Sequence, residues 1–150
     1  MILATMPSDF PNFTDELSAY CRLRGMKIEP AKVANSRGNH VIKLRSSPDK
    51  IILLYVKVSN IAQAWWGINE HQVKGLNSAG DWHLIFLLGD EGKSFVLTSH
   101  YVNGCIEHKD WSYQASKGEY KFHYDKSEPK SFPHFTTFGD LFDYLVSVAN

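Results

Sequence analysis

The chain lacks the features that mark several large classes of protein. Its 150 residues contain only two cysteines, Cys21 and Cys105, with no CxxC spacing, so no disulfide framework is expected. No apolar run approaches the roughly 18 residues of a membrane span. The first residues have no basic segment and are too short for the core of a secretory signal. We therefore expect no membrane association and a cytoplasmic, reducing setting.

Familiar catalytic motifs are also missing. The sequence has no glycine-rich phosphate loop, no Gly-x-Ser-x-Gly elbow and no cysteine in a nucleophile context. His100, Cys105 and His108 match no common zinc spacing, so no metal site is assigned to them. The net charge is zero, whereas a dedicated, unaided DNA-binding domain is more often basic overall. Sequence motifs alone therefore assign no activity.

The composition is that of a globular protein with a substantial core. Hydrophobic residues make up 43% of the chain and aromatic residues 13%, which argues against disorder. A chain of this length can bury a core without metal or disulfide staples, and we expect one domain over residues 1–150. Charge is uneven: residues 20–57 carry nine basic against two acidic residues, a net charge of +7. This segment could meet phosphates, or it could be a solvated face balanced by acidic neighbours.

Lys57 lies where a lysine is unusual. It is near the end of the apolar run 51–58, which has the length of a strand covered on both faces. Lysine is rarely buried unless it is paired, so this side chain needs a carboxylate, a phosphate or a route to solvent. Because side chains alternate along a strand, Tyr55 and Lys57 point to the same side.

Periodicity and turn chemistry predict the order of the elements. The first third is predicted to form a helix that opens at Phe13 or Thr14 and stops at Gly25, a short extended piece at 26–28, and a hairpin of 39–45 and 50–58. The middle is predicted to form a loop at 60–67, a helix capped by Asn69 and ended by Gly80, and strands 82–88 and 93–98. The last part is predicted to form a helical turn at 100–103 capped by Ser99, a strand at 120–124, a loop at 125–136 and a final helix capped by Thr137.

The order helix, hairpin, helix, hairpin over residues 14–98 resembles the core of the PD-(D/E)XK nuclease superfamily, most of all the archaeal Holliday-junction resolvases. In that pattern Glu16 falls on the acidic helix position and Asn39 on the aspartate that opens a strand. Tyr55 and Lys57 fall on the Glu-x-Lys positions of the next strand, and Gln72 on the helix glutamine. The separations of 23 residues from Glu16 to Asn39 and 18 from Asn39 to Lys57 fit the pattern.

The resemblance implies a site at which carboxylates hold Mg²⁺, the metal activates water, and the lysine offsets charge in the transition state. The motif is broken at two of its three essential places, because asparagine and tyrosine are poor Mg²⁺ ligands. Asp49 belongs to the predicted hairpin turn, six residues before Tyr55, and so does not replace the missing acid. Mg²⁺ is the cofactor that activity would require, and catalysis is expected to be degenerate.

Several residues have a second interpretation. Gln72 can complete the capping box of its helix, and Glu16 can complement the dipole of the first helix. Tyr55 can be a core residue with a satisfied hydroxyl. Trp65 and Trp66 can form a base-stacking or partner-binding patch, or can be half-buried beside a helix start.

The predicted fold is a single α/β domain with a restriction-endonuclease-like core: a central mixed sheet flanked by helices, with a C-terminal strand–helix extension. One hypothesis is a divergent Mg²⁺-dependent nuclease or a pseudonuclease that binds DNA through Lys57, Arg37, Lys43 and Arg45. The other is a protein-binding module on the same fold, such as an inhibitor, an immunity protein or an accessory subunit. The resemblance hints at a homodimer, although no segment demands one.

Overall fold

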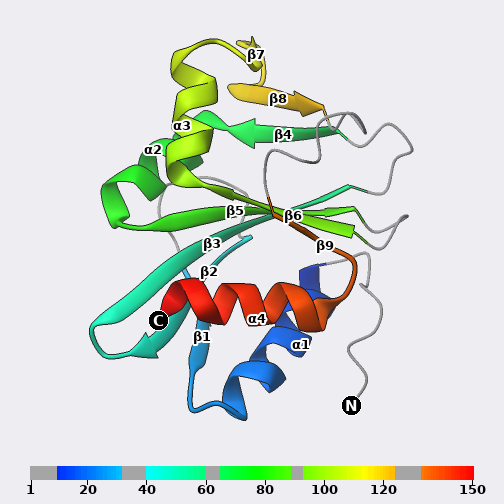
Figure 1. Cartoon of the computed structure of the whole chain (residues 1–150). Coiled ribbons are helices and arrows are strands. Elements are labelled where there is room, and N and C mark those ends of the chain that lie inside the picture. Colours follow the sequence, from blue (N-terminus) through cyan, green and yellow to red (C-terminus); the bar gives the residue numbers. More distant parts are fainter. Residues whose placement is uncertain (1–9, 32–39, 60–64, 89–92, 124–132) are drawn as a thin grey trace.

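A computed structural model of the chain describes residues 10–31, 40–59, 65–88, 93–123 and 133–150. Within these residues the chain forms four helices and nine strands (Figure 1). Their bounds are α1 (Phe10–Arg22), β1 (Lys27–Pro30), β2 (Val41–Ser47), β3 (Lys50–Ser59), β4 (Trp65–Asn69), α2 (Glu70–Ala79), β5 (Trp82–Leu88), β6 (Lys93–Thr98), α3 (Ser99–Glu107), β7 (Ser112–Gln114), β8 (Glu119–His123), β9 (His134–Phe135) and α4 (Phe138–Ala149).

Six strands form a central mixed sheet in the order β1-β2-β3-β5-β6-β9. β3 and β5 run parallel, in register from Leu53 opposite Trp82 to Ser59 opposite Leu88, and every other pair is antiparallel. The predicted mixed α/β architecture is therefore confirmed, including the hairpin of β2 and β3.

The central sheet separates two hydrophobic cores. Alternate residues of β3 point to opposite faces, so Leu54 and Val56 join one core while Leu53 and Tyr55 join the other. Helices α1 and α4 cover the first face, where Phe13 meets Phe142 edge to face at 5.7 Å (Figure 1). Helices α2 and α3 pack against the second face. Because both faces are covered, the strand is apolar along almost its whole length.

A second sheet, with the order β4-β8-β7, also lies over the face that carries Tyr55. Its β4 and β8 are antiparallel, with Asn69 opposite Glu119. Trp66 and Phe122 stack on Phe86 of the central sheet at 4.2 and 4.7 Å between ring centroids. This aromatic stack holds the second sheet against the central one.

Short polar side chains begin the helices, as their sequences predict. The Asn69 Oδ1 atom accepts a hydrogen bond from the Gln72 backbone N–H at 2.9 Å, and Thr137 does the same for Asp140 at 3.1 Å. Gly80 follows α2 as predicted. For α3 the cap is Thr98 and not Ser99, because the Thr98 hydroxyl accepts from the Tyr101 N–H.

Three further expectations were wrong, those for two loops and for a helical turn. The predicted loop at 60–67 contains the start of β4, and the loop at 125–136 contains β9. The helical turn at 100–103 is part of the longer helix α3, and the strand β7 was not expected. Of the predicted C-terminal strand–helix extension, the strand β8 belongs to a second sheet, and the helix α4 packs on the opposite face of the central sheet. No helix among the described residues is long and apolar enough to cross a membrane.

Lys109 is the one residue other than glycine that has a positive φ in the described part of the chain, at 58°. This left-handed conformation reverses the chain after α3, so that the Asp110 N–H donates to the Cys105 carbonyl at 2.9 Å. An L-residue pays roughly 1 kcal/mol for this conformation, because its Cβ atom crowds the backbone.

Lys109→Gly removes that Cβ atom and is expected to raise the free energy of unfolding by up to about 1 kcal/mol, partly offset by the larger entropy of unfolded glycine. Lys109→Ala is the matched control: it removes the same charge but keeps the Cβ atom, so it gains nothing. Urea unfolding of the three proteins measures the difference. Equal stabilities of the glycine and alanine variants would contradict the backbone explanation.

Candidate functional site

Lys57 lies in the second half of β3, on the face that the second sheet covers. Its Nζ atom is 5.7 Å from the centroid of the Tyr55 ring, which confirms that the two side chains share a face. Its position in the sheet is opposite Phe86, on which Trp66 and Phe122 stack. Burial lowers the pKa of Lys57, because a low-dielectric setting disfavours the charged form.

Two charged residues of β8 lie near this ammonium. The charge of Glu119 raises the pKa of Lys57 and the charge of Lys121 lowers it, but burial outweighs both. Lys121 Nζ pairs with Glu119 Oε1 at 2.5 Å, and the two side chains are only 13% and 23% exposed. We call Lys57, Glu119 and Lys121 the lysine cluster. With one carboxylate for two ammonium groups, it carries a formal charge of +1.

Within the lysine cluster the Glu119 carboxylate forms an ion pair with Lys121 and not with Lys57. No carboxylate of the described residues lies within ion-pairing distance of the Lys57 ammonium. A partly buried ammonium without a close counter-ion is costly, and an incoming anion would reduce that cost.

Gly67 makes room for the Glu119 carboxylate. A Cβ atom at Gly67 would lie 2.7 Å from the carboxylate carbon and from both of its oxygens. The carboxylate therefore lies against the backbone of β4, although the Asn69–Glu119 pair is two pairs along the ladder from the Gly67–Lys121 pair. Glycine is required here by close approach and not by its backbone angles.

Tyr55 occupies the position at which the family resemblance implies a glutamate. It is 3% exposed, and burial raises its pKa to about 12, while a hydrogen bond with the Asn69 backbone opposes the increase. The phenol is thus neutral and fixed beneath the second sheet. It packs as the core interpretation of the sequence expects, and it offers no anionic oxygen to a metal.

His40 directly precedes β2, and its imidazole is close enough to Lys57 to be affected by the lysine charge. Burial lowers its pKa, the positive charge of Lys57 lowers it further, and a backbone hydrogen bond with Val56 opposes both. The His40 carbonyl accepts a hydrogen bond from the Val56 N–H at 2.8 Å, which fixes the backbone there. His40 therefore adds a neutral imidazole to the surroundings of the lysine cluster at pH 7. Its neighbour Asn39 lies outside the described residues.

Gln72 and Glu16 lie on different sides of the central sheet. Gln72 is buried in the first turn of α2, a helix that packs on the same face as Tyr55. Glu16 belongs to α1, whose core residues Phe13 and Leu17 pack on the opposite face. The Oε2 atom of Glu16 is buried with no hydrogen-bond partner in the described part of the chain. The sheet thus gathers Tyr55, Lys57 and Gln72 on one face and leaves Glu16 on the other.

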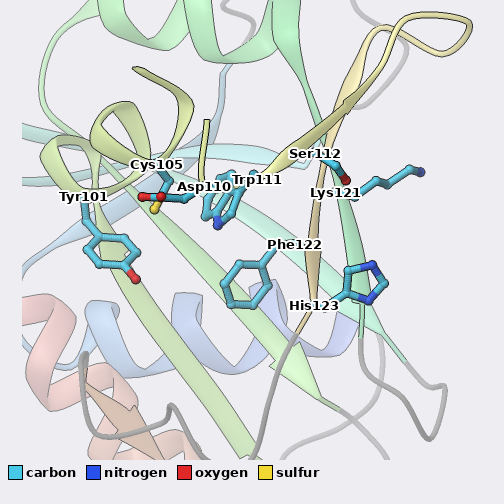
Figure 2. A pocket seen from close by; sticks show the side chains of 8 residues that line it. All are labelled: Tyr101, Cys105, Asp110, Trp111, Ser112, Lys121, Phe122 and His123. Carbon is cyan, nitrogen blue, oxygen red and sulfur yellow. The ribbon is translucent and has the colours of Figure 1, made fainter. Parts of the chain in front are cut away.

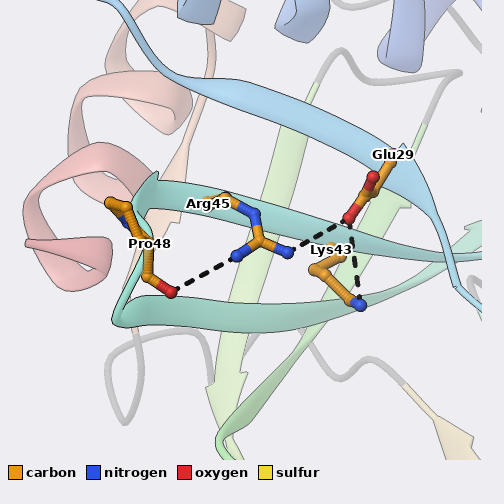
Figure 3. A network of polar contacts seen from close by, with 4 residues as sticks. All are labelled: Glu29, Lys43, Arg45 and Pro48. Atoms are coloured by element: carbon orange, nitrogen blue, oxygen red, sulfur yellow. Dashed lines mark hydrogen bonds and ion pairs between the residues drawn. The ribbon is translucent and has the colours of Figure 1, made fainter.

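The basic residues predicted to bind nucleic acid are partly neutralised. Glu29 of β1 lies 3.8 Å from Lys43 Nζ and 3.5 Å from Arg45 Nη2, and Arg45 Nη1 also donates to the Pro48 carbonyl (Figure 3). Both side chains remain about one-third exposed. Arg37 lies outside the described residues.

The two tryptophans belong to β4. Trp66 is 2% exposed and is stacked on Phe86, so it presents no ring face to a base in this structure. The backbone of Trp65 opens the same strand, opposite His123, and its side chain lies outside the described atoms.

Glu119 and Lys121 were not among the sequence candidates. Their signal is the sequence Glu119-Tyr120-Lys121, an acid and a base on one face of a strand, but Glu119 is 62 residues from Lys57. The pairing of β8 with β4 brings Glu119 and Lys121 near Lys57 in the fold.

The donor set of this site does not fit Mg²⁺. Hard divalent cations take several oxygen ligands, usually with more than one carboxylate. Glu119 is the carboxylate coupled to Lys57, and it is already paired with Lys121. The described residues include no group of three or more His, Cys, Asp or Glu side chains arranged to hold a metal.

No protein-family model matches the chain, and no curated protein matches its sequence. The resemblance to nucleases therefore depends on the order of elements and on the residues described above.

Lys57→Met tests whether the buried charge of Lys57 lowers the free energy of unfolding. Because the folded pKa lies below the unfolded value, the wild-type protein gains stability as pH rises through the folded pKa toward about 10.5. The methionine variant should lose this part of the pH dependence and should be more stable at pH 7 by about 1 kcal/mol. Chemical denaturation at several pH values measures both effects. If the methionine variant is less stable at pH 7 and its stability depends on pH as in the wild-type protein, the Lys57 charge does not destabilise the fold.

Gly67→Ala tests the placement of Glu119. The new methyl group should displace the flexible carboxylate and take a favourable charge away from Lys57, so the pKa of Lys57 should fall further. Titration of the lysine 13Cε signals by NMR measures this pKa. Gly104→Ala is the control, because a Cβ atom at Gly104 meets nothing within 4 Å. An unchanged Lys57 pKa in Gly67→Ala would argue against the coupling.

Proposed function

We propose that the protein binds nucleic acid on a nuclease-like core, holding phosphate at the lysine cluster, and does not cleave it by Mg²⁺ chemistry. The observation that carries the proposal is the Lys57 ammonium: it is partly buried, it has no carboxylate at ion-pairing distance among the described residues, and a second lysine is near it. A phosphate would supply the anion that Lys57 lacks, and lysine binds phosphate as a point charge.

The chain order supports the proposal. Helix α1, the antiparallel strands β1 to β3, helix α2 and then β5 parallel to β3 follow the order that the family resemblance implies. Lys57 lies on the third of these strands, and Gln72 lies on the helix that follows. The resemblance placed both residues there.

The chemistry of the donors argues for binding without cleavage. Tyr55 is a buried neutral phenol in place of a carboxylate, and Glu119 is paired with a lysine. Phosphodiester cleavage in the family manner needs carboxylates that are available to hold a metal. The two lysines have no such requirement, since they need only attract an anion.

A protein-binding module is the second candidate function. It is favoured by the net charge of zero and by Leu23, which is 84% exposed directly after α1. A single exposed leucine is common on protein surfaces, so this observation is weaker than the buried ammonium. An inhibitor, an immunity protein or an accessory subunit would use such a surface, and a homodimer would as well.

Fluorescence anisotropy with a labelled DNA duplex of about 20 base pairs tests the proposal. Binding should weaken steeply with salt, since each phosphate contact contributes about 0.9 to the slope of log K against log salt. Lys57→Met should reduce that slope by about 1 and weaken binding at low salt.

Lys27→Met is the matched control, because Lys27 is exposed on β1, the edge strand of the central sheet, and β2 separates it from β3. It should leave the salt slope unchanged. The proposal fails if the wild-type protein shows no binding at about 50 mM salt, or if the two variants behave alike. Cleavage of the duplex that depends on added Mg²⁺ would show the binding-only form of the proposal to be wrong.

A further inference from the structure

A pocket of about 570 Å³ lies between α3 and the end of β8 (Figure 2). Its aromatic part comprises Tyr101, Trp111 and Phe122, and its polar part includes Asp110, Ser112 and His123. Lys121 lines the pocket as well. The volume is within the range of ligand sites, roughly 300–1,000 Å³.

The pairing of the second sheet creates this hollow. Strand β7 begins at Ser112, which pairs with Lys121, so the last two residues of β8 extend past the start of β7. Before Ser112 the chain has just turned back from α3 through the left-handed Lys109. That turn brings the Trp111 ring against Phe122, edge to face, with 5.3 Å between centroids. Two of the three lining rings, Trp111 and Phe122, are buried and fixed by packing, while Tyr101 is half-buried and leaves part of its ring exposed.

The chemistry of the lining suits a planar heterocycle. Aromatic rings offer stacking or edge contacts to any base, since every base has a π face. The Asp110 carboxylate accepts hydrogen bonds, and the Ser112 hydroxyl can donate or accept. Such groups recognise the donor and acceptor edge of a base that is not paired with another base.

Lys121 connects the pocket to the lysine cluster. It lines the pocket and also pairs with Glu119, beside Lys57. A nucleotide carries a base and a phosphate on one sugar, so it has both of the groups for which these adjoining regions are suited.

We infer that the pocket between α3 and β8 receives the base of an unpaired nucleotide whose phosphate lies at the lysine cluster. The phosphate half of this inference rests on the proposed function. An unpaired position in a strand and a free nucleoside monophosphate share this chemistry, and the experiment distinguishes them.

Ser112→Trp tests the pocket by filling it. Ser112 is exposed at the pocket edge, so the large side chain can be introduced without disturbing the core. Ser116→Trp is the matched control, because Ser116 undergoes the same substitution and is exposed in the turn between β7 and β8, outside the pocket. Circular dichroism and thermal unfolding confirm that both variants fold.

The probes are a labelled single-stranded 12-mer of deoxythymidine, a labelled duplex, and free dTMP and AMP. Ser112→Trp should weaken single-strand binding by about fivefold or more, the lower range for one stacked base. It should weaken duplex binding much less, because paired bases cannot enter the pocket. Ser116→Trp should match the wild-type protein with every probe. Binding of dTMP or AMP that Ser112→Trp abolishes, without strand binding, identifies a free nucleotide as the ligand.

The two proposals fail separately. If duplex binding keeps its salt dependence while Ser112→Trp binds the single strand and the monophosphates as the wild-type protein does, the pocket inference is overturned and the proposed function stands. If no DNA binds but a monophosphate binds and is blocked by Ser112→Trp, the proposed function fails and the pocket inference holds in its free-nucleotide form. If no probe binds the wild-type protein, both are overturned.

Discussion

The parallel pairing of β3 with β5 is the constraint on which the rest of the molecule depends. Two parallel neighbours cannot be joined by a tight turn, so the chain must cross from the end of one strand to the start of the other. Here that crossover contains β4 and α2. Strand β4 then provides the edge on which β8 and β7 assemble. The second sheet therefore exists because the crossover carries a strand, and this sheet covers Lys57 and supplies Glu119 and Lys121.

Burial and charge oppose each other at Lys57, and burial is the larger effect on its pKa. A hydrophobic residue there would suit the stack of Trp66 and Phe122 on Phe86 better than an ammonium does. Glu119 does not remove the cost, since Lys121 holds its carboxylate. Lys57 therefore stabilises the fold poorly and would gain from an anion, a balance that the proposed phosphate site would account for, because functional sites commonly cost stability.

Local signals predicted most of the central sheet, because its strands and turns are encoded within short windows. The strands 82–88 and 93–98 and the caps Asn69 and Thr137 needed only neighbouring residues. The second sheet could not be predicted in this way. Its β4 is a five-residue strand that contains Gly67, and its partner β8 lies some fifty residues further along the chain. The long separation in sequence also prevented the prediction of Glu119 as a site residue. Lys57 could be predicted because its charge interrupts an apolar run.

The alternation of side chains in β8 gives this strand two different roles. Phe122 points into the aromatic stack and helps to form the pocket wall, while Glu119 and Lys121 form the ion pair beside Lys57. A shift of β8 by one residue against β4 would reverse both sets, moving the charges into the core and Phe122 out of it. The core therefore fixes the register of β8 strongly, and the register in turn fixes the charges. The Glu119–Lys121 pair is thus held in place by hydrophobic packing on the other side of the same strand, and its position relative to Lys57 follows from the packing of the second sheet on the central one.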